Sequence, residues 1–187
     1  MSDERPPDDR VLVALQPPCA FIRIMGRASF KVGTALKQFG QGALDAGAQT
    51  MAFDMADCSG MDSTFMGVLA GMALRLRKAG GVMVLFNLNG RTRGLVATLG
   101  LDQIVEAHEA GSLPPALQDL ADRSLKLRVL ATGPESKHAT ARTMLEAHEN
   151  LVQVDAANQP RFKDVLTFLR EDLKNLGAKA PDVRGNT

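Results

Sequence analysis

The run GVMVLFNL at residues 81–88 limits what this chain can fold into more than any other stretch. It places a block of apolar residues, Val82–Phe86, between a glycine and an asparagine. A strand of this composition is apolar on both faces, so both faces must be covered. Such strands occur in parallel sheets whose connections run through helices. The run therefore predicts an α/β fold.

The stretches on either side of this run continue the same alternation. Short apolar runs indicate strands, and apolar positions at three- and four-residue steps indicate helices that stop at glycines. The order predicts a mixed sheet, because the first two strands form a hairpin and the later ones are joined through helices. Strands are expected at 11–16, 19–25, 50–55, 81–88 and 104–105. Helices are expected at 30–46, from Ser63 to the glycine pair 80–81, and at 91–100.

Beyond Gly111 the pattern changes, because prolines and isolated apolar patches replace the regular elements. Two amphipathic helices then follow, separated by Asn158-Gln159-Pro160, which offers a cap candidate and a first-turn proline. We expect a helical hairpin appended to one α/β domain. The predicted organisation is a disordered tail at 1–9, a domain at 10–110, a connector at 111–134, a helical extension at 135–178 and a second disordered tail at 179–187.

The apolar faces of the two C-terminal helices must be covered by something. Three alternatives are open: the first domain, a second copy of the chain in a homodimer, or a different partner. The faces are formed by Ala141, Met144, Leu145, His148, Leu151 and Val152 in the first helix, and by Phe162, Val165, Leu166, Leu169, Leu173 and Leu176 in the second.

Charge and composition exclude several function classes. With 22 basic and 21 acidic residues, the chain has no charge excess that would favour nucleic acid as a partner. Its three histidines have no metal-ligand spacing, and no phosphate-binding glycine loop or nucleophile elbow is present. We therefore expect no enzyme activity, catalytic residue, metal or cofactor. Arg91 and Arg93 at a helix start leave anion or nucleotide binding open, with a solvated helix end as the simpler interpretation.

The N-terminus, MSDERPPDDR, is acidic and proline-rich and has no apolar signal-peptide core. Nowhere does the sequence hold an apolar run long enough to cross a membrane. We expect a cytoplasmic protein without direct membrane insertion.

The stretch MDSTFMG at 61–67 is the strongest candidate for a functional site. It places an acidic residue and two hydroxyls at a strand-to-helix junction, where Asp62 or Ser63 is expected to cap the helix, with Ser63 favoured. Gly67 and Gly71 lie four residues apart and so share one helix face, which either a partner or this chain can approach closely.

These residues resemble the motif of the STAS domain family, whose founding members are anti-sigma-factor antagonists. The matching stretches are DSTFMGVL at 62–69, GGVMV at 80–84 and LGLD at 99–102. The resemblance covers roughly residues 10–110 and implies a STAS-like α/β fold with a mixed sheet, to which the C-terminal helical hairpin extension expected from the helix periodicity is added. Two departures stand out: Phe65 replaces the usual glycine, and Arg27-Ala28-Ser29 stands where antagonists carry an acidic pair.

The resemblance implies a bacterial, non-enzymatic regulator of transcription and signal transduction. Its partners would be a serine kinase that doubles as an anti-sigma factor and a phosphatase that resets the site. Ser63 is then the expected phosphorylation site, with Thr64 as the alternative. The expected partner-binding residues are Asp62, Ser63, Thr64, Phe65, Gly67, Gly71 and Ser29.

Physical chemistry agrees with a charge switch at Ser63. A phosphate carries a charge of about −1.5 to −2 and is stabilised at a helix N-terminus. Beside Asp62 it would repel an acidic or apolar docking surface while the fold stays intact. The alternative from another class is a structural or scaffolding STAS protein, which assembles a homo-oligomer through the C-terminal helices or belongs to a membrane transport complex.

Overall fold

The computed structural model of the chain describes residues 9–112, 115, 118 and 126–178. The strands are β1 (Arg10–Gln16), β2 (Cys19–Ala28), β3 (Thr50–Met61), β4 (Val82–Leu88), β5 (Glu106–Glu109) and β6 (Arg128–Val129). The α-helices are α1 (Gly33–Asp45), α2 (Ser63–Lys78), α3 (Gly90–Thr98), α5 (Lys137–Val154) and α6 (Asn158–Ala178). Two short 3₁₀ helices are η1 (Phe30–Val32) and η2 (Leu101–Gln103).

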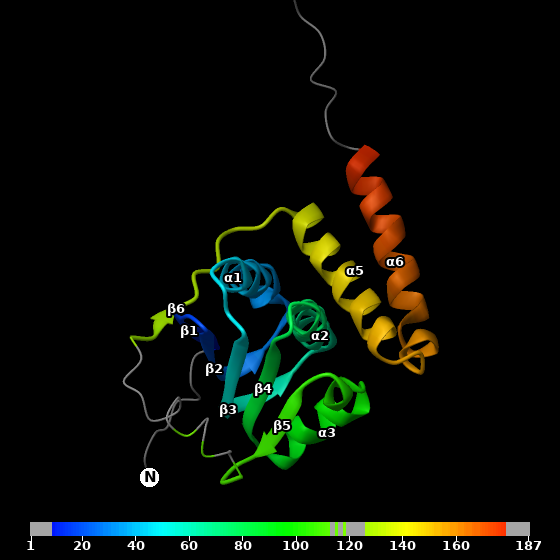
Figure 1. Cartoon of the computed structure of the whole chain (residues 1–187). Coiled ribbons are helices and arrows are strands. Elements are labelled where there is room, and N and C mark those ends of the chain that lie inside the picture. Colours follow the sequence, from blue (N-terminus) through cyan, green and yellow to red (C-terminus); the bar gives the residue numbers. More distant parts are fainter. Residues whose placement is uncertain (1–8, 113–114, 116–117, 119–125, 179–187) are drawn as a thin grey trace, which may run out of the picture.

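Within the described residues the strands form one mixed sheet in the order β5-β4-β3-β2-β1-β6. The pairs β1–β2 and β1–β6 are antiparallel, whereas β2–β3, β3–β4 and β4–β5 are parallel. Helices α1 and α2 lie side by side on one face of the sheet, α5 lies beside α2, and α6 is outermost (Figure 1). The predicted α/β class, the mixed sheet and the C-terminal helical hairpin are confirmed.

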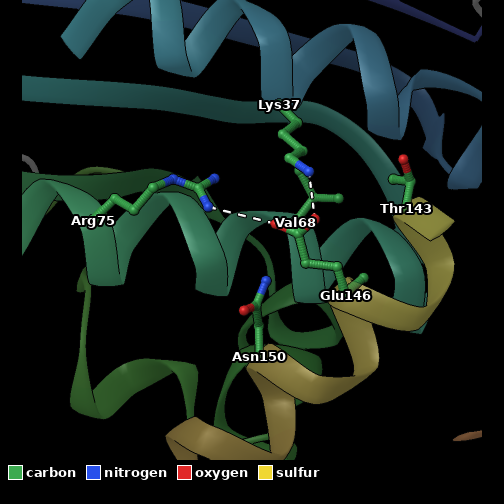
Figure 2. A pocket seen from close by; sticks show the side chains of 7 residues that line it. Lys37, Val68, Arg75, Thr143, Glu146 and Asn150 are labelled. Atoms are coloured by element: carbon green, nitrogen blue, oxygen red, sulfur yellow. Dashed lines mark hydrogen bonds and ion pairs between the residues drawn. The ribbon is translucent and has the colours of Figure 1, made fainter. Parts of the chain in front are cut away.

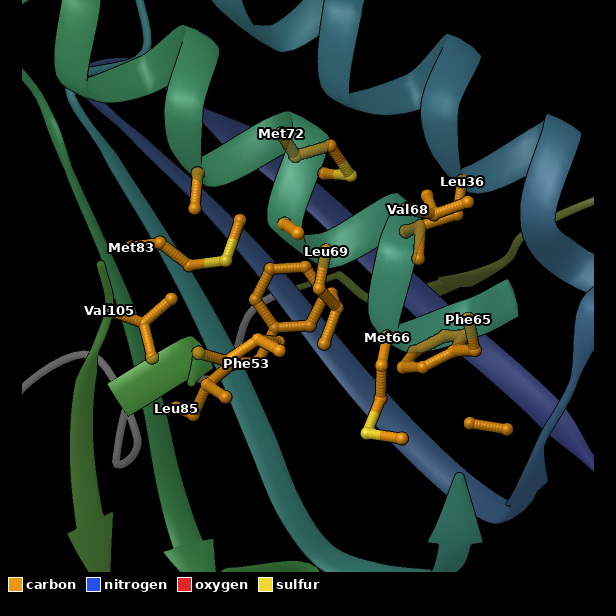
Figure 3. Close-up of a cluster of buried hydrophobic side chains, with 14 of the residues drawn as sticks. Leu36, Phe53, Phe65, Met66, Val68, Leu69, Met72, Met83, Leu85 and Val105 are labelled. Carbon is orange, nitrogen blue, oxygen red and sulfur yellow. The ribbon is translucent and has the colours of Figure 1, made fainter. Parts of the chain in front are cut away.

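The core lies between α2 and the sheet. Figure 3 shows Phe53 and Leu85 of neighbouring strands beside Leu69 of α2, with Phe65 one turn earlier on the same helix. All four side chains are fully buried. Burial of one such side chain contributes about 1.5–3 kcal/mol to stability, so this layer fixes where α2 begins and which of its faces points outward.

Strand β3 is longer than predicted, because it continues from the expected end near residue 55 to Met61. Polar residues in its second half hide it from a search for apolar runs. In the first half of the strand, within the predicted part, Asp54 is buried, and its carboxylate accepts hydrogen bonds from Arg23 Nε at 3.0 Å and Asn87 Nδ2 at 2.9 Å. The extension matters because it carries the chain directly to the start of α2.

The last parallel strand was placed wrongly by the sequence pattern. The apolar pair at 104–105 precedes β5, which begins at Glu106. Val105 is buried by packing against the core rather than by strand pairing. The segment 111–134, interpreted as a connector, contains β6, which pairs with β1 at the edge of the sheet.

The C-terminal hairpin packs on the α/β domain of the same chain. Leu151 of α5 and Phe162 and Leu166 of α6 belong to the same buried cluster as the sheet residues. Asn158, at the first position of α6, donates from its amide to Leu99 O at 3.1 Å and to Leu151 O at 2.9 Å, which ties the hairpin to the end of α3. Three alternatives were open for what covers the apolar faces of these helices. In the structure, the first domain of the same chain covers the apolar face of α5.

The expected disordered tails lie almost entirely outside the described residues. Residue 9 is the exception, because the Asp9 carboxylate accepts a hydrogen bond of 2.7 Å from Arg27 N. Among the residues that the structure describes, no helix is long and apolar enough to cross a membrane.

Candidate functional site

The junction between β3 and α2 is organised by Asp62. Its backbone is extended, with φ −91° and ψ 168°, and Oδ1 accepts a hydrogen bond of 2.8 Å from Phe65 N. Its second oxygen accepts one of 2.8 Å from Phe30 N, at the start of η1. Asp62 is therefore the N-cap, and the expectation that Ser63 caps the helix is wrong. A carboxylate at this position also interacts favourably with the positive end of the helix dipole.

Because Asp62 satisfies the cap, the hydroxyl of Ser63 is left for another contact. Ser63 is the first residue of α2 and is half-buried. Its Oγ lies 3.0 Å from Nε2 of His148, in the middle of α5. The structure thus joins the candidate site to the C-terminal hairpin across 85 residues of sequence.

The second ring nitrogen of His148 determines the direction of that hydrogen bond. Nδ1 lies 2.7 Å from Met144 O, and a carbonyl oxygen only accepts, so Nδ1 carries a hydrogen. In the neutral imidazole Nε2 then has a free lone pair, and the Ser63 hydroxyl donates to it. His148 is 3% exposed, and its ring packs edge-on against Phe162, with ring centroids 4.9 Å apart.

The other two predicted residues of the motif point inward. Thr64 is 3% exposed and Phe65 is fully buried in the core. Neither side chain offers surface to a partner in this conformation, and Ser63 is the more accessible of the two hydroxyls. Phe65, the departure from the family's glycine, is accommodated as a core residue.

The two glycines of α2 face α5 of the same chain. A Cβ added at Gly67 would overlap the carbonyl group of Ala147 and lie 2.7 Å from its Cα. A Cβ at Gly71 would overlap the side-chain amide of Asn150, and that amide donates to Gly67 O at 3.2 Å. The close approach that the glycine pair predicts is made by α5.

Charged groups flank this contact (Figure 2). Glu146 of α5 forms ion pairs with Lys37 of α1 and with Arg75 of α2, the latter at 3.6 Å. The cavity left between the three helices measures only about 10 Å³. That is at the lower limit for one water molecule, so α5 packs closely on the α2 face.

The remaining candidates lie nearby but are not all joined to this contact. Ser29 is half-buried in the turn before η1, and Asp62 N donates to the adjacent Ala28 O at 3.0 Å. Arg93 donates to Ala107 O at 2.8 Å, which gives it a structural role. Arg91 lines a recess of about 170 Å³ with Arg27 and Ser59, which is smaller than the usual 300–1,000 Å³ of a small-molecule site.

Nucleophile and metal chemistry have little support in the described part of the chain. There, no group of three or more His, Cys, Asp or Glu residues is placed to hold a metal ion. Burial raises the pKa of the Cys58 thiol above its usual value, despite lowering contributions from the backbone of Gly60 and Ala28. A raised pKa leaves less thiolate, so this cysteine is a poor nucleophile.

Sequence patterns alone did not reveal the residues that α5 contributes. His148 was assigned only to the apolar face of a helix, and Glu146 and Asn150 were not singled out. The one usable signal was the Gly67–Gly71 spacing, which indicates a close helix contact without naming the helix.

Comparison with known proteins supports the family assignment. The family model described as "Mlab, STAS domain" matches residues 11–106, just over half of the chain. This chain belongs to the STAS domain family. No curated protein matches the chain closely enough to count as a relative.

Solved structures of low sequence identity are similar to this STAS domain. A putative anti-sigma factor antagonist (tm1081) from Thermotoga maritima has 16% identity and a TM-score of 0.50, with 58% of this chain and 92% of that chain covered. An anti-sigma factor antagonist from Mycobacterium paratuberculosis has 20% identity and a TM-score of 0.49, with 60% of this chain and 93% of that chain covered. The anti-sigma factor antagonist SpoIIAA in its unphosphorylated form has 15% identity and a TM-score of 0.46, with 60% of this chain and 97% of that chain covered. At 16% identity, the likeness to the Thermotoga maritima structure supports the fold and says nothing of function.

The contact at Gly67 gives the first prediction. Gly67→Ala forces a methyl group against the backbone of Ala147, so α5 must shift, and overpacking of this kind costs about 1–3 kcal/mol of unfolding free energy. Gly42→Ala is the matched control, because nothing lies within 4 Å of the added methyl group in α1. The control should gain about 0.4–1 kcal/mol. Urea denaturation measures both, and equal midpoints for the two variants would contradict the close contact.

Proposed function

We propose that this chain is a non-enzymatic regulatory STAS module that binds a partner-switching serine kinase, which doubles as an anti-sigma factor. Phosphorylation of Ser63 controls the binding, and a phosphatase reverses it. The observation that carries the proposal is the position of Ser63 at the first residue of α2, half-buried, with its helix capped by Asp62 instead.

The electrostatics of the junction support a switch at this residue. A phosphate on Ser63 would lie at the positive end of the α2 dipole, which stabilises it. It would also lie one residue from the Asp62 carboxylate, so two negative groups would face any docking partner. The core residues beneath, Thr64 and Phe65, are not required to move. The domain would keep its fold while its surface charge changes.

The proposed binding surface combines the Ser63 junction with Ser29 and the outward face of α2. In the structure α5 covers Gly67 and Gly71, so an external partner contacts these two glycines only when α5 leaves them. Asp62, Ser63 and Ser29 lie at the end of the covered face.

Capture of partners from a lysate of the native cells tests this function. Ser63→Asp should lose at least tenfold in the yield of a bound kinase, whereas Ser63→Ala should retain it, because only the first adds charge. Ser59→Asp is the control, since Ser59 is exposed four residues before the site and adds the same charge. Equal kinase yields from the two Ser63 variants would contradict the switch, as would the absence of Ser63 phosphopeptides in protein from those cells.

A second candidate function, assembly of a homo-oligomer as a scaffold, rests on the outer side of α6. Phe168 is 66% exposed and Val165 is 39% exposed. Two large apolar side chains one helical turn apart are a favourable contact for a second copy of the chain.

Light scattering over a concentration series distinguishes this candidate. A scaffold should show a dimer mass that Phe168→Ser converts to a monomer mass, because burial of the phenyl ring is lost. Thr167→Ser, at the neighbouring exposed position, should leave the mass unchanged. A monomer mass for the unmodified chain at all concentrations would contradict the scaffold.

A further inference from the structure

Helix α5 contacts the α2 face with the features of a protein interface rather than of a loose appendage. A small residue, Ala147, lies against Gly67, and two polar side chains that follow it in α5 also join the helices. These are the Asn150 amide on Gly67 O and the His148 ring on the Ser63 hydroxyl. Glu146 adds ion pairs to Lys37 and Arg75.

This contact covers the residues that the proposed function requires for a partner. The Ser63 hydroxyl is engaged by a buried imidazole, and the two glycines are in contact with α5. An enzyme that transfers a phosphoryl group to Ser63 must reach this hydroxyl, and a docked partner must reach the glycines. Both events require α5 to move away from α2.

We propose that the α5–α6 hairpin is an internal competitor for the partner-binding face of α2. The proposal rests on the proposed function and adds a regulation to it. When the hairpin is closed, Ser63 is protected and the face is filled, and when it opens, both become available. Because the hairpin belongs to the same chain, its high effective concentration favours the closed state over a weak external partner.

The chemistry of α5 also defines the partner that can replace it. Such a partner presents a helix with a small residue opposite Gly67, because nothing larger than the Ala147 backbone contact fits there. It carries a carboxylate toward the cations of Lys37 and Arg75. An external partner with these features gains the contacts that α5 gives up.

Thiol labelling of the full chain tests the competition without any partner. Ser63→Cys introduces a thiol at the protected position, and its rate of modification measures how often α5 opens. Adding Glu146→Lys places a third cation between Lys37 and Arg75, so the rate should rise at least fivefold. Adding Glu149→Lys is the matched control, because Glu149 is exposed on the same helix and its ion pair, with Arg170 at 3.0 Å, lies within the hairpin. Its rate should stay within twofold of Ser63→Cys alone.

Two further readouts keep the test decisive. Peptide-resolved mass spectrometry follows Cys58 in the same samples, and slow labelling of this buried thiol shows that the core is intact. Adding Asn150→Ala, which removes the amide hydrogen bond to Gly67 O and the amide contact with Gly71, should raise the rate in the same direction by a smaller factor.

Equal labelling rates for the Glu146→Lys and Glu149→Lys chains, with Cys58 still protected, would overturn the competition. If labelling rises as expected but Glu146→Lys captures no more kinase than the unmodified chain, the hairpin does open and the proposed kinase partner is wrong. The two failures are therefore distinguishable.

Discussion

The close approach of α5 to α2 is the contact on which the arrangement of the candidate site depends. It exists because Gly67 has no side chain, so the backbone of Ala147 can lie directly against the helix. That approach sets the position of α5, and through it the position of His148 beside Ser63. A single missing Cβ thus determines whether the hydroxyl at the start of α2 faces solvent or an imidazole.

The polar groups around this contact give it a definite geometry. A purely apolar interface tolerates sliding, whereas hydrogen bonds at Ser63 and at Gly67 O are each made at one position of α5 only. Both involve half-buried or buried groups, for which loss of a partner is costly. The interface therefore specifies one position of α5 on α2.

Much of the fold follows from the sequence because its signals are local. Helix α2 is predicted by the repeat of apolar residues and the glycine pair at its end, and β4 by its unbroken apolar run. The end of β3 was missed because polar residues alternate there, and β6 because a two-residue strand leaves no pattern. The cap was assigned to the wrong neighbour, since Asp62 and Ser63 are both good capping residues and only the backbone geometry separates them.

Only the α2 side of the candidate site was predicted from the sequence. The motif singled out Ser63 and the glycines, but its contact with His148 joins positions 85 residues apart, and helix periodicity does not encode which helices meet. The direct test of this contact is a long-range ¹H–¹⁵N correlation spectrum of the imidazole of His148 in the full chain at neutral pH. In the neutral ring we expect the proton on Nδ1 and a Nε2 resonance that shifts when Ser63 is replaced by alanine. A proton on Nε2 in the neutral ring, or a Nε2 resonance unchanged by the replacement, would contradict it.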